Sequence, residues 1–305
     1  MPELPDIELY LHALRPRLVG RPVAAVRLAS PFLVRTTSPD IQTLTPRVIG
    51  GLQRMGKRIV IETDGPYLVI HLMVAGRFQW RAEGAPIPKR LGLMAIDVPG
   101  GCLLLTEAGT TRRAAVHVVA DREALAAMDP GGIEVLDAPL ATFREVLARE
   151  RHTLKRTLTD PSLFSGIGNA YSDEILHRAR LSPLRMSDAL SLEEAARLHH
   201  ATQHVLIEWR DRLIAETGHG FPVKVTAFRA EMAVHGRFGL PCPTCRTPVQ
   251  RLRYASNEAN YCPACQTEGR LLADRGLSRL LKSDWPRRLD ELERRKASHR
   301  LPGDS

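Results

Sequence analysis

Two Cys-x-x-Cys motifs are the clearest chemical signal in this 305-residue sequence. Cys242 and Cys245 form the first motif, Cys262 and Cys265 form the second, and 16 residues separate the two. Four thiolates complete a tetrahedral zinc shell with Zn–S distances of about 2.3 Å, which leaves no ligand position for water. The spacing therefore predicts one structural Zn2+ ion, and the alternative is four reduced cysteines without a metal.

The amino terminus, Met1-Pro2-Glu3, can supply a nucleophile. Removal of Met1 would leave Pro2 with a free secondary amine, and an α-amine titrates at about 8 in model peptides. Attack of a neutral amine on an aldehyde carbon gives an iminium cation, which is covalent catalysis of the Schiff-base type. Glu3 could then transfer protons beside it. The alternative is an extended start that caps the first helix.

A glycine-rich turn, Ser165-Gly166-Ile167-Gly168-Asn169, opens a predicted helix and could bind a phosphate. Glycines allow a positive φ and a close approach of another chain, and a helix start presents unpaired N–H groups. Asn169 could cap this helix or donate to the phosphate, and Lys155 lies one helix upstream. The alternative is a tight helical connection with no ligand.

The charge balance favours a polyanionic partner. The formal net charge is +9, and the basic residues are 37 Arg and only 6 Lys, among them Lys57 and Lys155. An ammonium can give up a proton where a guanidinium cannot, so each rare lysine is a weak candidate for a chemical role. The sequence has no run of 18 apolar residues, which excludes a membrane span, and its start does not look like a secretory signal.

The residues described above must be positioned by two differently patterned parts of the chain. Helical apolar spacing over 7–18 is followed by short apolar runs bounded by Gly and Pro, which predict a β-sandwich or barrel. The predicted strands are Val23–Leu28, Arg58–Thr63, Tyr67–Met73, Leu93–Val98, Leu103–Thr106 and Ala115–Val119. Cys102 lies alone in an apolar run and is interpreted as a buried small hydrophobic residue.

After the loop signal Asp129-Pro130-Gly131-Gly132 the apolar spacing becomes helical. It predicts helices over Leu140–Arg149, Leu154–Leu158, Asn169–Ala179 and Leu192–Thr217. Ser191 and Glu194 form a capping-box pattern before the last of these. The segment between the cysteine motifs suits a β-hairpin with Val249–Tyr254 as one strand. We expect a short helix over 271–281, and a mobile, charge-rich tail over 286–305.

Taken together, these features resemble the formamidopyrimidine-DNA glycosylase / endonuclease VIII (Fpg/Nei) family. The resemblance covers roughly residues 2–282, and its motifs are jointly specific although each one alone is not. It is carried by Pro2-Glu3-Leu4-Pro5-Asp6-Ile7-Glu8, Gly56-Lys57-Arg58, His71-Leu72, Gly166-Ile167-Gly168-Asn169-Ala170-Tyr171-Ser172-Asp173-Glu174, Val234-His235-Gly236-Arg237 and the four cysteines.

The resemblance implies an α+β multidomain fold. It combines an N-terminal β-sandwich and flanking helix with a helix-two-turns-helix domain and a four-Cys zinc ribbon, and DNA would lie in a basic cleft between the two parts. It also implies excision of oxidised bases and strand nicking. Pro2 matches the Schiff-base nucleophile, Glu3 the proton-transfer carboxylate and Lys57 a lysine used in β-elimination. Lys155 and Asn169 match positions that hold backbone phosphates.

Three departures from the family pattern stand out. Asn257 occupies the ribbon-tip position where the family usually has an Arg that assists δ-elimination, so we expect β-elimination with weak δ-elimination. The family's gap-filling side chains are also altered, which leaves Val74, Arg112 and Arg113 as weak candidates. The segment 219–233 looks short for a full lesion-capping loop, so the preferred lesion of relatives need not be preferred here.

The sequence thus supports two hypotheses. The first is a DNA glycosylase and abasic-site lyase acting through Pro2, and the second is a DNA-damage-binding family member with little or no base excision. We expect four parts: a catalytic sandwich over 1–125, a helical domain over 126–238, the zinc ribbon over 239–270, and a short helix with a mobile basic tail over 271–305. A monomer that acts on damaged DNA inside the cell, in the cytoplasm or with the nucleoid, is expected, with no membrane partner.

Overall fold

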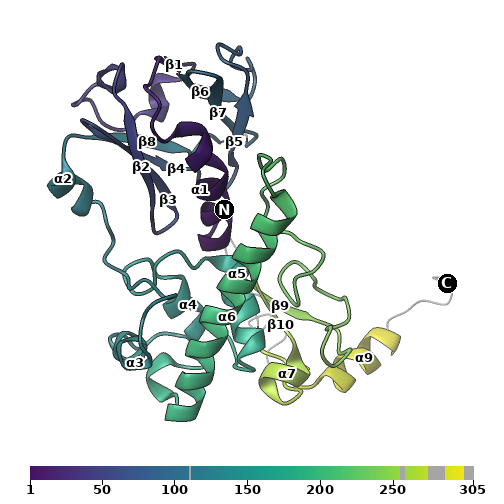
Figure 1. The fold of residues 1–305 in the computed structure, drawn as a ribbon. Coiled ribbons are helices and arrows are strands. Elements are labelled where there is room, and N and C mark those ends of the chain that lie inside the picture. Colours follow the sequence, from purple (N-terminus) through teal and green to yellow (C-terminus); the bar gives the residue numbers. More distant parts are fainter. Residues whose placement is uncertain (110, 255–257, 274–285, 299–305) are drawn as a thin grey trace. The chain divides into compact units, whose positions relative to one another are not determined.

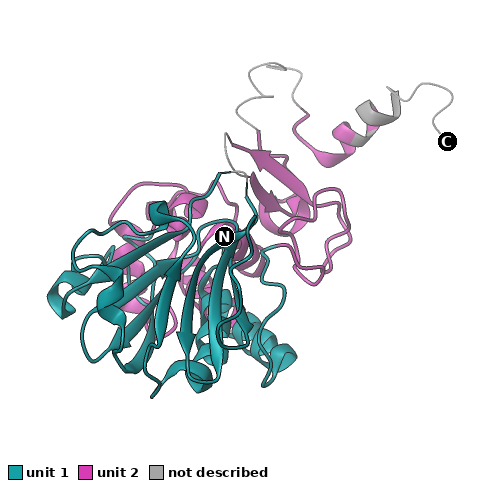
Figure 2. Ribbon diagram, turned by 90° about the horizontal axis from the view of Figure 1, so that it is seen from above, with its two compact units in different colours: residues 1–134, 161–167, 206–227 teal, residues 135–160, 168–205, 228–305 magenta. Residues whose placement is uncertain are grey.

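The computed structural model describes residues 1–109, 111–254, 258–273 and 286–298 (Figure 1). The chain divides into two compact units, each assembled from three separate segments (Figure 2). Unit 1 comprises residues 1–134, 161–167 and 206–227, and unit 2 comprises residues 135–160, 168–205 and 228–305. None of the helices within the described ranges is long and apolar enough to cross a membrane.

Unit 1 contains two four-stranded antiparallel sheets, which confirms the predicted β-sandwich. The first sheet has the order β1 (Ala25–Leu28), β6 (Gly92–Val98), β7 (Gly101–Glu107) and β5 (Gly76–Arg81). The second has the order β2 (Ile49–Met55), β3 (Arg58–Thr63), β4 (Tyr67–His71) and β8 (Ala115–Val119). Short helices α2 (Arg122–Ala126), η1 (Pro31–Leu33) and η2 (Ile41–Leu44) lie between or after these strands.

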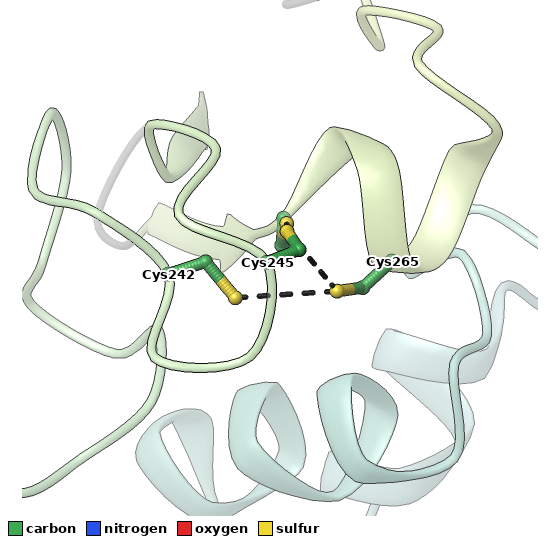
Figure 3. Close-up of side chains that lie close together, drawn as sticks. Cys242, Cys245 and Cys265 are labelled. Atoms are coloured by element: carbon green, nitrogen blue, oxygen red, sulfur yellow. Dashed lines mark hydrogen bonds between the residues drawn. The ribbon is translucent and has the colours of Figure 1, made fainter.

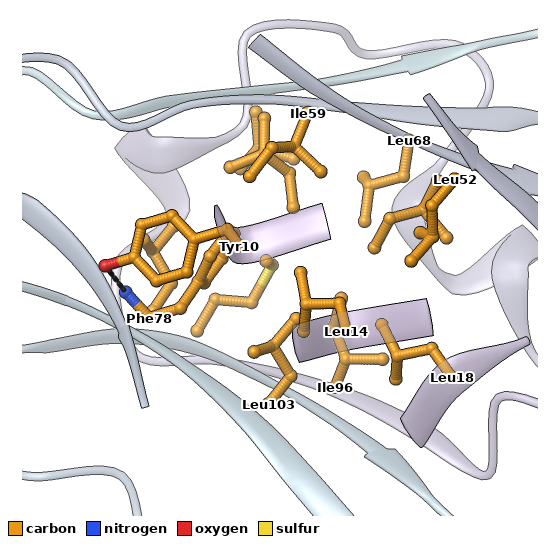
Figure 4. Close-up of a cluster of buried hydrophobic side chains, with 14 of the residues drawn as sticks. Tyr10, Leu14, Leu18, Leu52, Ile59, Leu68, Phe78, Ile96 and Leu103 are labelled. Atoms are coloured by element: carbon orange, nitrogen blue, oxygen red, sulfur yellow. Dashed lines mark hydrogen bonds between the residues drawn. The ribbon is translucent and has the colours of Figure 1, made fainter. Parts of the chain in front are cut away.

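One hydrophobic core joins both sheets to the first helix, α1 (Leu4–Leu18). Side chains of α1, including Tyr10, Leu14 and Leu18, are buried among residues from both sheets (Figure 4). The Tyr10 hydroxyl accepts a hydrogen bond from the Phe78 N–H at 3.3 Å, and the two rings meet edge to face. This packing fixes α1, and with it the chain segment that begins at the amino terminus.

Two strands of the sandwich, β2 and β5, were not expected from the sequence. Gly50 and Gly51 interrupt the apolar pattern of β2, and Gly51 lies at a register shift in its pairing with β3. In β5, Phe78 is buried while Arg77 and Gln79 alternate with it, so a weak period-2 pattern is present. Both strands are stabilised by pairing with neighbouring strands whose residues favour β-structure much more strongly. The apolar pattern of β2 or β5 alone does not show this contribution.

Unit 2 holds the predicted helices close to their expected bounds. They are α3 (Leu140–Ala148), α4 (Leu154–Thr159), α5 (Asn169–Arg178) and the first part of α6 (Leu192–Thr217). A short helix that was not predicted, η3 (Ser187–Ala189), precedes α6. The expected capping box of α6 is present, because Glu194 N–H donates to Ser191 Oγ at 3.1 Å and Ser191 N–H donates to Glu194 Oε2 at 2.9 Å.

The cysteine segment of unit 2 forms the predicted hairpin from β9 (Gln250–Arg253) and β10 (Glu258–Tyr261), followed by α7 (Pro263–Thr267). A further helix, α9, spans Leu289–Ser298. Residues 271–273 of the expected 271–281 helix are not helical, and the rest of that segment lies outside the described residues, as does the end of the tail after residue 298.

Candidate active site and zinc centre

The amino terminus lies inside unit 1. Pro2 and Glu3 are buried, and Glu3 is only 2% exposed. Burial lowers the pKa of the Met1 α-amine below its usual value of 8.0, and the charges of Arg77 and Lys57 lower it further, against the opposite effects of Glu3 and Asp6. An amine with a lowered pKa is neutral more of the time near pH 7. The charges of Glu3 and Lys57 therefore both act on the α-amine at the start of the chain.

Glu3 also caps α1. Its carboxylate accepts from the backbone N–H of Asp6, while Glu3 N–H donates to Asp6 Oδ2 at 3.0 Å, which completes a reciprocal capping box. The helix-capping role that the sequence offered as the alternative for this segment is thus present in the molecule. The two roles are compatible, because a carboxylate has four lone-pair sites and the cap uses only part of them.

Lys57 lies in the two-residue turn that joins β2 to β3. Met55 pairs with Arg58 across this turn. Gly56 has φ +59, and two-residue hairpin turns favour glycine because they need a positive φ at this position. Burial lowers the pKa of Lys57 below its usual 10.5, and the Glu3 charge opposes this shift. Lys57 and Glu3 are 54 residues apart in sequence, so the effect of the Glu3 charge on Lys57 depends on the packing of α1 against the second sheet.

The turn that contains Gly166 is in contact with the amino-terminal segment in unit 1. Leu4 N–H donates to Gly166 O at 2.9 Å. Gly166 has φ +80, and a Cβ there would lie 2.8 Å from Leu4 Cβ. The close backbone approach expected for this glycine is therefore made to the chain's own amino terminus.

Lys155 and Asn169 are brought together in unit 2, as the sequence suggested. Lys155 is buried, and its Nζ donates to Asn169 O at 2.6 Å, Ser172 Oγ at 2.8 Å and Asp173 Oδ1 at 2.5 Å. An ammonium has three donors, so a phosphate could bind it only by replacing one of these bonds. Asn169 begins α5, and Gly168 is its N-cap.

Asn169 keeps some hydrogen-bonding capacity. Its Nδ2 donates to Glu258 O on β10 at 2.9 Å, whereas its Oδ1 is buried and has no partner among the described atoms. The position of Asn257, the ribbon-tip residue, lies outside the described residues.

Two acidic residues of α5, Asp173 and Glu174, bind the segment that contains the Val234-His235-Gly236-Arg237 motif. The Asp173 Oδ2 lies 2.8 Å from His235 Nδ1, and all three backbone N–H groups of Ala233, Val234 and His235 donate to the Glu174 carboxylate at 2.7–2.9 Å. Burial raises the pKa of Glu174 despite these bonds. These contacts are structural, and they were not assigned from the sequence.

The candidate gap-filling residues lie on two adjacent turns of unit 1. Val74 is 57% exposed in the turn between β4 and β5. Arg112 and Arg113 are exposed in the loop between β7 and β8, where Arg112 donates to Arg90 O at 2.8 Å. A Cβ on Gly109 of that loop would lie 3.5 Å from Ala75 Cβ, which places the two turns side by side. The segment 219–233 contains turns without a helix or strand.

The four predicted zinc ligands converge in unit 2. All four Sγ atoms lie within 4.8 Å of one another, and Figure 3 shows the contacts that join Cys265 to Cys242 and to Cys245. The Sγ atoms of Cys245 and Cys262 are 3.3 Å apart, and those of Cys242 and Cys265 are 4.0 Å apart. A tetrahedron with Zn–S bonds of about 2.3 Å has S–S edges of about 3.8 Å, so the arrangement fits zinc.

Comparison with known proteins gives three family matches in succession along the chain. Residues 1–116 match the formamidopyrimidine-DNA glycosylase N-terminal domain, and residues 132–210 match the formamidopyrimidine-DNA glycosylase H2TH domain. Residues 239–267 match a zinc finger found in FPG and IleRS. This last match includes all four cysteines, and with their geometry it confirms the prediction of one structural zinc ion.

Individual relatives are similar in sequence to half or more of this chain. A formamidopyrimidine-DNA glycosylase of Desulforamulus reducens is 31% identical over 284 residues, which cover 87% of this chain and 99% of the relative. One of Thermus thermophilus is 33% identical over 276 residues, with 88% and 100% coverage. An uncharacterized formamidopyrimidine-DNA glycosylase-like protein of Mycobacterium tuberculosis is 40% identical over 151 residues, which are 50% of this chain and 94% of that protein.

Solved structures show the same fold. The Lactococcus lactis Fpg in complex with DNA that contains an abasic site superposes with a TM-score of 0.76 at 23% identity, and covers 87% of this chain and 99% of that chain. A mutant of the same protein with DNA that contains Fapy-dG gives a TM-score of 0.76 at 24% identity, with coverage of 87% and 100%.

Proposed function

This chain belongs to the formamidopyrimidine-DNA glycosylase family of DNA-repair proteins, and from that premise we propose that it excises damaged bases and then nicks the strand through a Schiff base at Pro2. One observation carries this proposal. Pro2 and Glu3 are buried at the start of the chain, and the charges of both Glu3 and Lys57 act on the Met1 α-amine that directly precedes Pro2. A neutral amine, a carboxylate and a second amine are the groups that this reaction needs.

The proposed reaction has two stages. After removal of Met1, the Pro2 nitrogen attacks C1′ of the damaged nucleotide as the bond from C1′ to the base breaks, and the proton that the nitrogen loses leaves with the base. The sugar ring then opens as the protonated form of Glu3 transfers its proton to O4′, which leaves a carboxylate at Glu3 and an iminium between C1′ and Pro2. Loss of a C2′ proton, with Lys57 assisting, expels the 3′ phosphate by β-elimination. Water then hydrolyses the iminium and releases Pro2.

The charge of the protein suits a DNA substrate. Its formal net charge is +9, and phosphate neutralisation by Arg and Lys releases counterions from DNA, so binding should weaken steeply with added salt. Extrusion of the damaged nucleotide from the stack costs a few kcal/mol, which this binding would supply. The Lactococcus lactis Fpg structures, described with abasic-site and Fapy-dG DNA, agree with damaged DNA as the partner here. Such a substrate is found inside the cell, with the chromosome.

Lys155, Asn169, Arg112 and Arg113 are proposed DNA contacts, and Asn257 is proposed to limit the reaction to β-elimination. A neutral amide at the ribbon tip lacks the charge to stabilise the second departing phosphate. The four cysteines would hold zinc, which supplies a rigid base for the ribbon and no reacting group.

Borohydride trapping on DNA with an abasic site tests the proposal. Intact-mass measurement first establishes the fraction of protein without Met1, because a retained Met1 converts the Pro2 nitrogen to an amide. We expect a covalent adduct whose proteolytic peptide carries the modification on Pro2, and we expect a large loss of adduct in Pro2→Gly.

The control is the same protein with one extra residue before Pro2, which blocks the secondary amine without changing the fold. Absence of an adduct in fully processed protein that still binds abasic DNA would favour the alternative, a damage-binding member with little excision. An adduct on another residue would refute the role of Pro2.

A further inference from the structure

Arg54, a residue of β2, contacts four different segments of unit 1. Its side chain is only 8% exposed. The guanidinium donates from Nε to Glu8 Oε1 at 3.0 Å, from Nη1 to Gly56 O and Ser165 Oγ at 3.1 Å each, and from Nη2 to Glu134 Oε2. Ser165 Oγ donates in turn to Glu134 Oε1 at 2.5 Å. A buried guanidinium is thus paired with two carboxylates and two further oxygens.

Three of these partners belong to segments that carry or support a proposed reacting group. Glu8 lies on α1, the helix that begins directly after Pro2 and Glu3. Gly56 immediately precedes Lys57 in its turn. Ser165 precedes Gly166, whose carbonyl oxygen accepts from Leu4 N–H. Arg54 is therefore the side chain that joins the amino-terminal helix, the Lys57 turn and the Gly166 turn.

We propose that Arg54 is a positioning residue that sets the distance between the Pro2 amine and Lys57. This inference rests on the reaction proposed above. Arg54 is not expected to touch DNA, because its side chain is almost fully buried and all three guanidinium nitrogens donate to protein oxygens. It acts through the backbone of Gly56 and through α1.

The chemistry of the site requires a guanidinium. Its donors lie in one plane and point in fixed directions, so it can reach oxygens on three sides at once. An ammonium at the same place is a point charge with three donors and no planar fork. A Cβ on Gly166 would lie 3.1 Å from Arg54 Nη1, which shows how closely the turn is packed on the guanidinium. Arg54→Lys should therefore restore part of the function lost in Arg54→Met.

The test compares Arg54→Met and Arg54→Lys with a matched control, Arg27→Met. Arg27 also lies in a strand of unit 1 and also makes an ion pair, with Asp97 at 2.6 Å, but none of its partners belongs to the reacting segments. The assays are the dissociation constant for DNA with a tetrahydrofuran abasic-site analogue and the single-turnover rate of borohydride trapping, both at a temperature where every variant is folded.

We expect Arg54→Met to lower the trapping rate about 10–100-fold with a dissociation constant within about threefold of wild type, because misplacement of a reacting group costs rate before binding. Arg54→Lys should be intermediate, and Arg27→Met should trap at the wild-type rate. A folded Arg54→Met protein that traps at the wild-type rate would overturn the proposal, and so would an equal loss in Arg27→Met.

A readout without DNA separates this proposal from the reaction on which it rests. Reductive methylation with formaldehyde and borohydride, in which hydride reduces the iminium to a methylamine, labels the terminal amine at a rate set by its exposure and neutral fraction. Arg54→Met should raise that rate severalfold relative to Arg27→Met, because the amino terminus is held less tightly. A raised rate supports positioning even if wild-type protein forms no adduct with DNA, a result that would count against the proposed function alone. An unchanged labelling rate would overturn the positioning role.

Discussion

Gly166→Ala is the substitution for which the structure gives the sharpest expectation. Gly166 has φ +80, in the left-handed region, and its carbonyl oxygen accepts from Leu4 N–H two residues after Pro2. An added Cβ would lie 2.8 Å from Leu4 Cβ and 3.1 Å from Leu4 Cδ1. The methyl group must therefore push on the segment that carries the proposed nucleophile.

The expected loss of stability has two parts. A left-handed conformation costs an L-residue with a Cβ roughly 1–2 kcal/mol. Insertion of an extra carbon into a packed site costs about 1–3 kcal/mol more, because Leu4 Cβ is attached directly to the backbone and cannot rotate away. The sum is about 2–5 kcal/mol, which is a large part of the roughly 5–15 kcal/mol that stabilises a native protein.

Gly20→Ala separates the two parts. Gly20 belongs to the same unit and has φ +81, but nothing lies within 4 Å of its added Cβ. It should lose only the conformational part, so Gly166→Ala should be less stable than Gly20→Ala by about 1–3 kcal/mol.

Urea unfolding followed by tryptophan fluorescence measures both values, since Trp80 and Trp209 lie in unit 1. Borohydride trapping should fall in Gly166→Ala and stay near wild type in Gly20→Ala. Equal destabilisation by the two substitutions would refute the argument, because it would mean that the turn does not press on Leu4.

Four further expectations can be checked directly. Lys57→Arg keeps the positive charge but cannot release a proton, so strand cleavage should fall by about 10²-fold while binding of abasic-site DNA is retained; equal loss of both would remove Lys57 from the chemistry. Cys245→Ser should abolish the zinc content of one ion per chain, measured by metal analysis, together with specific DNA binding, since metal binding and ribbon folding are linked. Asn257→Arg should raise the fraction of δ-elimination product on a sequencing gel, and an unchanged ratio would assign the tip another role. Burial lowers the pKa of His71 from 6.5 to about 4, and the charges of Arg58, Lys57 and His117 add to this effect. On acidification the unfolded chain therefore binds a proton at this histidine before the folded chain does, and the free energy of unfolding should fall by up to about 3 kcal/mol between pH 6.5 and 4. His71→Gln should flatten that part of a curve of unfolding free energy against pH.

Interactions of short range could be predicted from the sequence. The zinc ligands follow from the spacing of the Cys-x-x-Cys pairs, because two residues between thiolates are enough to close half of a tetrahedral shell. The capping box at Ser191 and the bounds of α6 follow from spacing along a single helix. The family, too, is evident from motifs that follow one another in a fixed order along the chain, and the comparisons confirm it.

Interactions between distant segments could not be predicted in this way. The sequence suggested that Lys155 and Asn169 could face one anion, but it did not indicate that the Lys155 ammonium would donate to Asn169, Ser172 and Asp173. It gave no sign that Arg54 would join four segments, of which Ser165 is 111 residues away. An arginine has no local pattern that identifies its partners, since these are set by the packing of α1 and the sheets.

The types of chemical group can thus be read from the residues alone: a proline directly after Met1, a neighbouring carboxylate, scarce lysines and four thiolates. Which of these groups lie near one another depends on the folded chain. The pKa of the terminal amine and of Lys57 depends on burial and on charges brought in from other strands and helices. Desolvation is a property of the folded surroundings and not of a residue or its neighbours in the chain, which is why it enters only with the fold.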